Sequence, residues 1–385
     1  MSATLNIFVT GATGYIGGCV VARLLKHPKA ASFQITALVR SNEKAEKLHT
    51  LGIKTIMGSY ADKNSGFLTE AASKADVVFA IADNDNLAAA EAILDGLKLR
   101  FEKTGKTPIL IHTSGTAIIN DDARGQHSNH KTYSDLETET LNAIPVTALH
   151  RNVDIPIVEA DKAGYVKTYI ITPGTVFGSP SGPLVDLKVQ NEHSQQIPYF
   201  IKPSIARKQG AYIGKGLSTW SAVDVEDTAD LFLVVFDVAT SGSTAVGHGA
   251  EGYYFVENFL YSGLEVAQKI SEALVELGIG STREPSAFSQ EELEKNFGPF
   301  WPLLSTNSHA QADRGRALGW VPKRSTKEAF LANVKEEVAF YAREQGPLAT
   351  VVEIVTFKAS EVLLANPAVA DSVLEYFKKA LGVLR

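Results

Sequence analysis

The sequence predicts an α/β fold in which parallel strands form one doubly wound sheet, followed by a smaller C-terminal lobe and a helical C-terminal extension. Two observations carry this prediction. Short apolar runs alternate with amphipathic stretches through the first half of the chain, and such alternation is typical of strand–helix–strand units. After about residue 178 the pattern loosens into clusters of Gly, Pro and Ser with shorter elements.

The expected strands are short runs rich in Val, Ile and Phe, and the expected helices are longer stretches with apolar residues at helical spacing. We expect strands at 6–10, 34–39, 55–58, 76–81, 108–112 and 168–171. We expect helices at 16–25, 43–49, 87–99 and 155–164. The polar stretch 115–144 is weakly patterned, and a loop of that length is usually functional or mobile.

The chain is expected to divide into three parts. Residues 1–178, with parts of 211–260, should form the sheet domain, and about 179–340 a lobe interleaved with it. Residues 341–385 should form the helical extension, which is apolar enough to need a partner surface. That surface is expected to be the chain's own lobe or a second copy in a homodimer.

Composition narrows the classes of function. The 385 residues are 45% hydrophobic and 21% charged, which is ordinary for a globular protein with a sizeable core. The net charge is -6 and no Lys/Arg run stands out, so a nucleic-acid partner is not expected. A single cysteine permits no internal disulfide. Neither a secretory signal nor an apolar run of membrane-spanning length is evident, so a cytoplasmic protein without a membrane partner is expected.

A glycine-rich loop follows the first expected strand directly and opens the first expected helix. Its glycines permit a tight turn and a close approach of backbone to a pyrophosphate, and the helix N-terminus adds N–H donors and a favourable dipole. This arrangement predicts a dinucleotide-binding, Rossmann-type domain. The expected cofactor-binding residues in the loop are Gly11, Thr13, Gly14, Tyr15, Ile16 and Gly17.

The end of the second strand favours NADP over NAD. NAD selection usually uses an Asp or Glu there, which accepts hydrogen bonds from the ribose hydroxyls. This chain instead places Arg40 at that point and Lys44 one helical turn later. A guanidinium offers a planar fork that suits a 2′-phosphate, so both residues are expected to bind NADP.

The motifs together resemble the extended short-chain dehydrogenases/reductases of the NAD-dependent epimerase/dehydratase type, over roughly residues 5–340. The loop spacing, the runs at 76–80 and 111–115, and the segments at 171–178, 220–227 and 318–322 are similar to motifs of that family. The resemblance implies that a small-molecule substrate binds between the sheet domain and the C-terminal lobe. It implies further cofactor contacts from Ala80, Thr113, Pro173, Gly174 and Val176, and a catalytic hydroxyl at Ser114.

The sequence departs from this family at its Tyr-x-x-x-Lys pair. None of the twelve tyrosines is followed by a Lys four residues later, and the matching positions hold His150 and Asp154. One interpretation makes His150 the acid/base group, with Asp154 at i+4 orienting it or stabilising its charge. A second takes the missing hydroxyl from Tyr133 in the long polar stretch. In a third the chemistry is lost, and the fold senses or holds a nucleotide.

Because the cofactor itself carries the hydride, a reductase can work with a different proton donor. We therefore expect an NADP-dependent oxidoreductase that reduces a carbonyl or an activated double bond. The alternatives are a silent NADP(H)-binding regulator or scaffold, and a nucleotide-sugar epimerase or dehydratase. No metal site is expected, since His127 and His130 lie in what should be a solvated loop.

Overall fold

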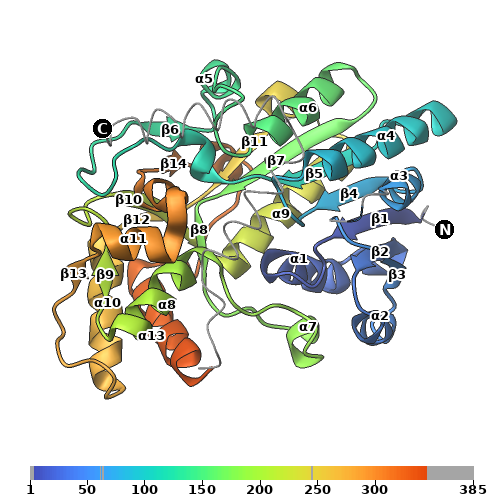
Figure 1. The fold of residues 1–385 in the computed structure, drawn as a ribbon. Coiled ribbons are helices and arrows are strands. Elements are labelled where there is room, and N and C mark those ends of the chain that lie inside the picture. The colour runs from blue at the N-terminus through green and yellow to red at the C-terminus, as the bar shows by residue number, and fades with distance from the viewer. Residues whose placement is uncertain (1–3, 61, 63–64, 244–245, 345–385) are drawn as a thin grey trace.

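The computed structural model describes residues 4–60, 62, 65–243 and 246–344. Its centre is a seven-stranded sheet in the order β11-β7-β5-β4-β1-β2-β3, with every neighbouring pair parallel (Figure 1). These strands are β1 Leu5–Thr10, β2 Phe33–Val39, β3 Lys54–Met57, β4 Val77–Ala80, β5 Ile109–Thr113, β7 Lys167–Pro173 and β11 Tyr253–Val256.

The predicted α/β doubly wound sheet is confirmed, and six of its seven strands lie where the sequence predicts them. The seventh, β11, comes from far along the chain and closes the sheet beside β7. Strands β4 and β5 are buried along their whole length, as expected for the centre of a parallel sheet covered on both faces. The strand order reverses between β1 and β4, so a crevice opens there at the carboxyl ends of the strands.

Helices cover both faces of the sheet. Helix α1 packs against α9 on one face, and α4 packs against α3 and α6 on the other (Figure 1). Helix α1 forms because Cys19, Val20, Val21 and Leu24 bury one apolar face against the sheet. The helices of this domain are α1 Tyr15–Lys26, α2 Asn42–His49, α3 Gly66–Ala72, α4 Leu87–Thr104, α6 Arg151–Lys162 and α9 Val225–Thr240, with a short η1 at Ala30–Ser32.

The polar stretch 115–144 is docked rather than solvated, which corrects the expectation of a free loop. The Asp121 carboxylate accepts hydrogen bonds from the backbone and side-chain N–H groups of Asn307, at 2.7 and 2.8 Å. The stretch contains η2 Thr116–Ile119, β6 Thr132–Ser134 and α5 Thr138–Asn142, and β6 pairs with β14 His309–Gln311 from the end of the lobe. These long-range partners have no local pattern that the sequence could reveal.

The C-terminal lobe is built from short strands and helices around two apolar clusters. One cluster contains Phe177, Tyr261 and Phe330, and the other contains Phe288 and Phe297. Helices α7 Pro183–Asp186, η3 Gly249–Glu251 and α12 Asp313–Ala317 also follow β7 but pack on the sheet domain. The lobe elements are β8 Thr175–Phe177, α8 Gln196–Arg207, β9 Ala211–Tyr212, β10 Thr219–Asp224, β12 Phe259–Ser262, α10 Gly263–Glu276, β13 Ser286–Ala287, α11 Gln290–Phe297, η4 Gly298–Ser305 and α13 Lys327–Arg343.

The end of the described chain bears on the predicted extension. Helix α13 contains residues 341–343, the first three residues of that extension. Residue 344 is also described, and residues 345–385 lie outside the described residues. No helix within the described ranges has the length and apolar character needed to span a lipid bilayer.

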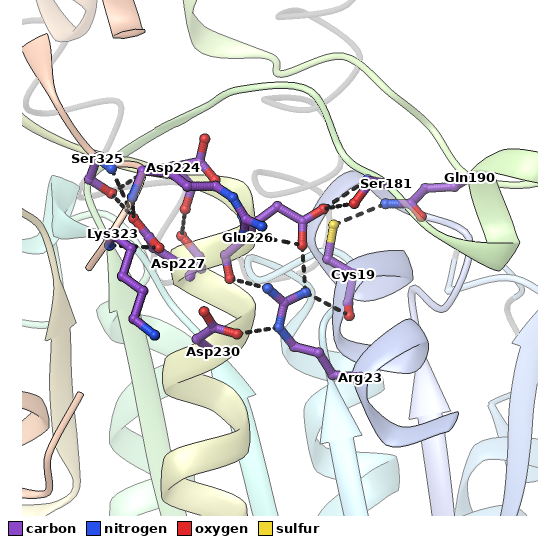
Figure 2. Close-up of polar contacts among 12 residues, drawn as sticks. Cys19, Arg23, Ser181, Gln190, Asp224, Glu226, Asp227, Asp230, Lys323 and Ser325 are labelled. Atoms are coloured by element: carbon purple, nitrogen blue, oxygen red, sulfur yellow. Dashed lines mark hydrogen bonds and ion pairs between the residues drawn. The ribbon is translucent and has the colours of Figure 1, made fainter. Parts of the chain in front are cut away.

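A buried carboxylate joins the lobe to the sheet domain at the start of α9. Asp227 is fully buried and accepts hydrogen bonds from the backbone N–H groups of Lys323, Arg324 and Ser325 and from the Ser325 hydroxyl (Figure 2). The Trp320 indole also donates to the Asp227 carbonyl oxygen at 2.9 Å. Such a fully satisfied buried carboxylate fixes the position of the loop before α13.

Candidate functional site

The glycine-rich loop has the shape that a pyrophosphate needs. Gly11 has φ +72°, and a Cβ there would lie 2.7 Å from the carbonyl carbon of Ile81. A Cβ on Gly17 would lie 2.1 Å from the Gly11 oxygen, so the first turn of α1 can pack on the loop only without a side chain. Gly14 caps α1 without any side-chain acceptor, which leaves the first N–H groups of the helix for a ligand. The loop therefore fits a dinucleotide.

Two cations stand together at the expected adenosine end of this loop. Arg40 is exposed directly after β2, and Lys44 lies in the first turn of α2. Partial burial lowers the pKa of Lys44, and the positive charge of Arg40 lowers it further. A dianionic phosphate placed between them would relieve this repulsion.

Tyr60, on the loop after β3, is a neighbour of this site that the sequence did not indicate. Its hydroxyl donates to Thr10 Oγ1 at 2.7 Å, and Asn86 Nδ2 donates to the Tyr60 carbonyl oxygen at 3.2 Å. Burial raises the pKa of Tyr60 above its usual range. The residue therefore ties the ends of three strands together at the edge where a nucleotide is expected.

An acid–base pair lies at the carboxyl ends of β4 and β5. His150 Nδ1 lies 2.6 Å from Asp85 Oδ1 and 3.2 Å from Asn84 Nδ2, and both partners come from the loop after β4. The imidazole rests against Gly115, where a Cβ would lie 3.0 Å from His150 Nε2. The side chains of His150 and Asp85 are 13% and 25% exposed. The pair is thus rigidly held and still open to a small molecule.

A buried polar network lies beneath this pair. Ser114 Oγ donates to Asp154 Oδ2 at 2.9 Å, and the Tyr253 hydroxyl donates to the same oxygen at 3.4 Å. Arg151 in turn donates to the Tyr253 hydroxyl. Burial raises the pKa of Asp154 to about 6, although the charge of His150, the Ser114 hydrogen bond and the charge of Arg151 each act to lower it.

His112 completes the network. Its Nε2 lies 3.9 Å from Asp154 Oδ1, and neither atom has a hydrogen-bond partner within the described part of the chain. Burial, reinforced by the charge of His150, lowers the pKa of His112 to about 3. The imidazole of His112 is therefore neutral at physiological pH.

Comparisons with known proteins agree with this architecture. The NmrA-like family matches residues 3–99. Oxidase ucsJ from an Acremonium species is 30% identical over 343 residues, covering 83% of this chain and 93% of the oxidase. The chain belongs to the NmrA-like family. An uncharacterized Schizosaccharomyces pombe protein, C2A9.02, is 28% identical over 342 residues, covering 86% of this chain and 99% of that protein.

Solved structures of a sugar epimerase and a sugar dehydratase share the fold of this NmrA-like chain. UDP-glucose 4-epimerase from Thermotoga maritima has a TM-score of 0.56 and 16% identity, covering 89% of this chain and 100% of the epimerase. An NAD complex of dTDP-glucose 4,6-dehydratase from Bacillus anthracis has the same TM-score and identity, covering 89% and 98% of the two chains. At such low identity the likeness concerns the fold alone.

In this NmrA-like protein the hydrogen-bond partner of His150 is Asp85 and not the expected Asp154, although the charge of His150 still acts on the Asp154 carboxyl. The Asp154 backbone N–H donates to the His150 carbonyl oxygen at 3.0 Å, but His150 has φ +67° and precedes α6, so its side chain does not share a helix face with that of Asp154. Asp85 accepts from the imidazole instead, and Asp154 points into the protein toward Ser114. Asp85 could have been suspected, because it follows a central strand at the edge where ligands of doubly wound sheets bind.

Ser114 also differs from its expected arrangement. The resemblance implied a hydroxyl that polarises the substrate, whereas the residue is only 2% exposed and its hydroxyl donates to Asp154. Tyr133, the alternative source of a hydroxyl, lies in β6, where its ring packs on His130 and under the Lys131 ammonium group. The structure thus joins Ser114 to Asp154, pairs His150 with Asp85, and gives Tyr133 packing contacts at the junction with the lobe.

The remaining expected cofactor residues lie near the carboxyl ends of central strands. Ala80 ends β4, Thr113 ends β5, Pro173 ends β7, and Gly174 and Val176 follow in the turn to β8 and within it. These positions lie at the carboxyl edge of the sheet or just after it, where the loops that bind a dinucleotide are expected.

The other residues considered as candidates have hydrogen-bonding or packing partners within the protein. His130 donates from Nε2 to the Ile119 carbonyl oxygen at 2.8 Å, and no group of three or more metal-ligating side chains occurs in the described ranges. Phe297 is fully buried in the lobe core. Trp220 lines a small cavity of about 30 Å³ inside the lobe, together with Phe200 and Tyr261.

Proposed function

We propose that the protein is an NADP(H)-dependent oxidoreductase that interconverts a carbonyl group and an alcohol, or reduces an activated double bond, in a small metabolite. The observation that carries this proposal is the His150–Asp85 pair, held at the carboxyl ends of β4 and β5 beside the phosphate-binding loop. In a doubly wound sheet this edge is where the reactive end of a dinucleotide meets its substrate.

The glycine-rich loop and two nearby cations would supply the cofactor contacts. Gly11, Gly14 and Gly17 leave room for the pyrophosphate, and the paired cations Arg40 and Lys44 favour a 2′-phosphate over a free ribose hydroxyl. When bound, NADP(H) supplies or takes up the hydride.

His150 would move the proton. Asp85 accepts a hydrogen bond from Nδ1–H, which leaves Nε2 as the atom that gives or takes the proton. In reduction, the protonated imidazole gives its Nε2 proton to the substrate oxygen and becomes neutral. In oxidation, neutral Nε2 takes the proton of the alcohol, and the Asp85 carboxylate stabilises the cation that forms.

The test combines cofactor binding with turnover on a panel of aldehydes, ketones and enones. We expect NADPH to bind more tightly than NADH, and at least one compound to be reduced. His150→Gln should lower kcat by at least about a hundredfold while the Kd for NADPH stays unchanged. His127→Gln is the matched control, because His127 is exposed in the polar stretch. Full turnover by His150→Gln would refute the role of His150.

A catalytically silent NADP(H)-binding regulator is the second candidate. It is favoured by the fully buried carboxyl of Asp154, which stands where the family has a lysine, and by the inward-facing hydroxyl of Ser114. This candidate predicts tight NADPH binding without NADPH oxidation across the whole panel. That result would displace the oxidoreductase proposal and leave the cofactor proposal standing.

A further inference from the structure

The segment between β8 and α8 runs back along α1 toward the glycine-rich loop. Leu184 in this segment is fully buried in the main core, and a Cβ on Gly182 would contact the Ala22 side chain at 3.5 Å. The Ser181 backbone N–H and hydroxyl both donate to Glu226 Oε1, at 2.8 and 2.9 Å. We call residues 178–191 the strap.

The strap ends on the carbonyl groups of the phosphate-binding loop. The Gln190 amide donates from Nε2 to the Tyr15 carbonyl oxygen at 3.0 Å and to Cys19 Sγ at 3.3 Å. The Asn191 backbone N–H donates to the Thr13 carbonyl oxygen at 2.9 Å. Gly18 makes this contact possible, because a Cβ there would lie 2.2 Å from Gln190 Cδ.

The planarity of the peptide between Tyr15 and Ile16 links these contacts to an N–H group that could bind a phosphate. Because the C=O of one residue and the N–H of the next point in opposite directions, fixing the Tyr15 carbonyl also fixes the Ile16 N–H. That N–H belongs to the first turn of α1, whose donors have no partner within the helix. The Gln190 side chain is itself buried, with a relative exposure of 7%, and is therefore held in place by its surroundings.

We propose that Gln190 is a positioning residue for the pyrophosphate of the dinucleotide, acting through the Tyr15 carbonyl to orient the donors of the phosphate-binding loop. This inference rests on the proposed NADP(H) binding. It assigns a role in cofactor binding to the strap, a segment outside the glycine-rich motif.

The far end of the strap is anchored firmly enough for this role. Figure 2 shows Arg23 of α1 between Glu226 and Asp230 of α9, while Glu226 also holds Ser181. The Arg23 Nη1–Glu226 Oε2 distance is 2.7 Å and the Arg23 Nε–Asp230 Oδ1 distance is 2.5 Å. Charge-assisted contacts of this kind fix α1, α9 and the strap relative to one another.

The test compares two ligands that differ in the pyrophosphate. NADP⁺ contains it, whereas adenosine 2′-monophosphate has the 2′-phosphate and no 5′-phosphate. Gln190→Met keeps the volume of the side chain and removes its donor. By calorimetry, we expect this variant to raise the Kd of NADP⁺ by about fivefold to tenfold, as for one lost hydrogen bond, and to leave the Kd of adenosine 2′-monophosphate unchanged.

Two further variants make the result decisive. Gly18→Ala displaces the Gln190 amide from the helix side and should reproduce the selective loss, while Asp186→Ala, at an exposed position of α7, should change neither Kd. Equal weakening of both ligands by Gln190→Met and Gly18→Ala would show a merely structural role and overturn the inference. Unchanged affinity for both ligands would overturn it too. If the wild type binds neither ligand, the proposed NADP(H) binding itself fails.

Discussion

Replacing Asp154 by Asn should abolish one component of the pH dependence of stability. Burial raises the pKa of this carboxyl to about 6 from its ordinary value of 3.8, because the cost of removing its charge from water exceeds the favourable contacts with Ser114, His150 and Arg151. The charged and titratable groups around it are His150, Arg151, Asp85, the neutral His112 and Tyr253, whose hydroxyl donates to it.

The direction and the size of this pH dependence follow from the coupling between proton binding and folding. A carboxyl whose pKa is raised on folding contributes stability that is complete below about pH 4 and is lost as the pH rises through about 6. The difference between about 6 and 3.8 corresponds to about 3 kcal/mol. Asn is uncharged at every pH and its oxygen can still accept from Ser114, so Asp154→Asn lacks this component.

The assay is urea unfolding of wild type and Asp154→Asn at a series of pH values between 4 and 8. The unfolding free energy of the variant minus that of the wild type should rise by about 2.5 kcal/mol across this range, most steeply near pH 5, midway between the pKa values of the unfolded and folded states. Asp186→Asn, at an exposed site, is the matched control and should give a flat difference. A flat or falling difference for Asp154→Asn would refute the reasoning that burial dominates at this site.

Three further substitutions test the site and the fold. Gly17→Ala should raise the Kd of NADP⁺ at least about tenfold in calorimetry, because its Cβ would lie 2.1 Å from the Gly11 oxygen. Gly115→Ala should press on His150 Nε2 and lower kcat about tenfold with an unchanged NADPH Kd, measured on whichever substrate the panel identifies. Asp227→Ala should cost about 3 kcal/mol of unfolding free energy in urea, because three backbone N–H groups and one hydroxyl lose their acceptor.

The sheet could be predicted because its signals are local. Buried parallel strands are near-continuous apolar runs, and strands such as β2 and β4 lie within two residues of their expected bounds. Strand β11, at Tyr253–Val256, also has a strand-like pattern, but its pairing with β7 spans about 80 residues of lobe sequence. Chain order gives no information about a contact of that range, so its place at the sheet edge could not be predicted.

The residues of the site also divide into those with a local sequence signal and those placed by long-range contacts. Gly11 and Gly17 follow from spacing, because a glycine that a turn or a close packing contact requires leaves a mark in the sequence itself. Gln190 leaves none, since it touches Tyr15 only after a segment of more than 170 residues has folded back along α1. A residue that acts on another residue's carbonyl group has no motif of its own, so only the structure reveals it.

The partner of His150 depends on one backbone angle. Had α6 begun a turn earlier, His150 and Asp154 would share a helix face and the expected pair would form. Because His150 instead adopts φ +67°, its ring turns toward the loop after β4 and meets Asp85. That loop also contacts the glycine-rich turn, since a Cβ on Gly11 would strike Ile81 and Ala82 at its start. One short segment therefore borders the glycine-rich turn and orients the proposed proton donor, so a shift of this loop on nucleotide binding would also move the acid–base pair.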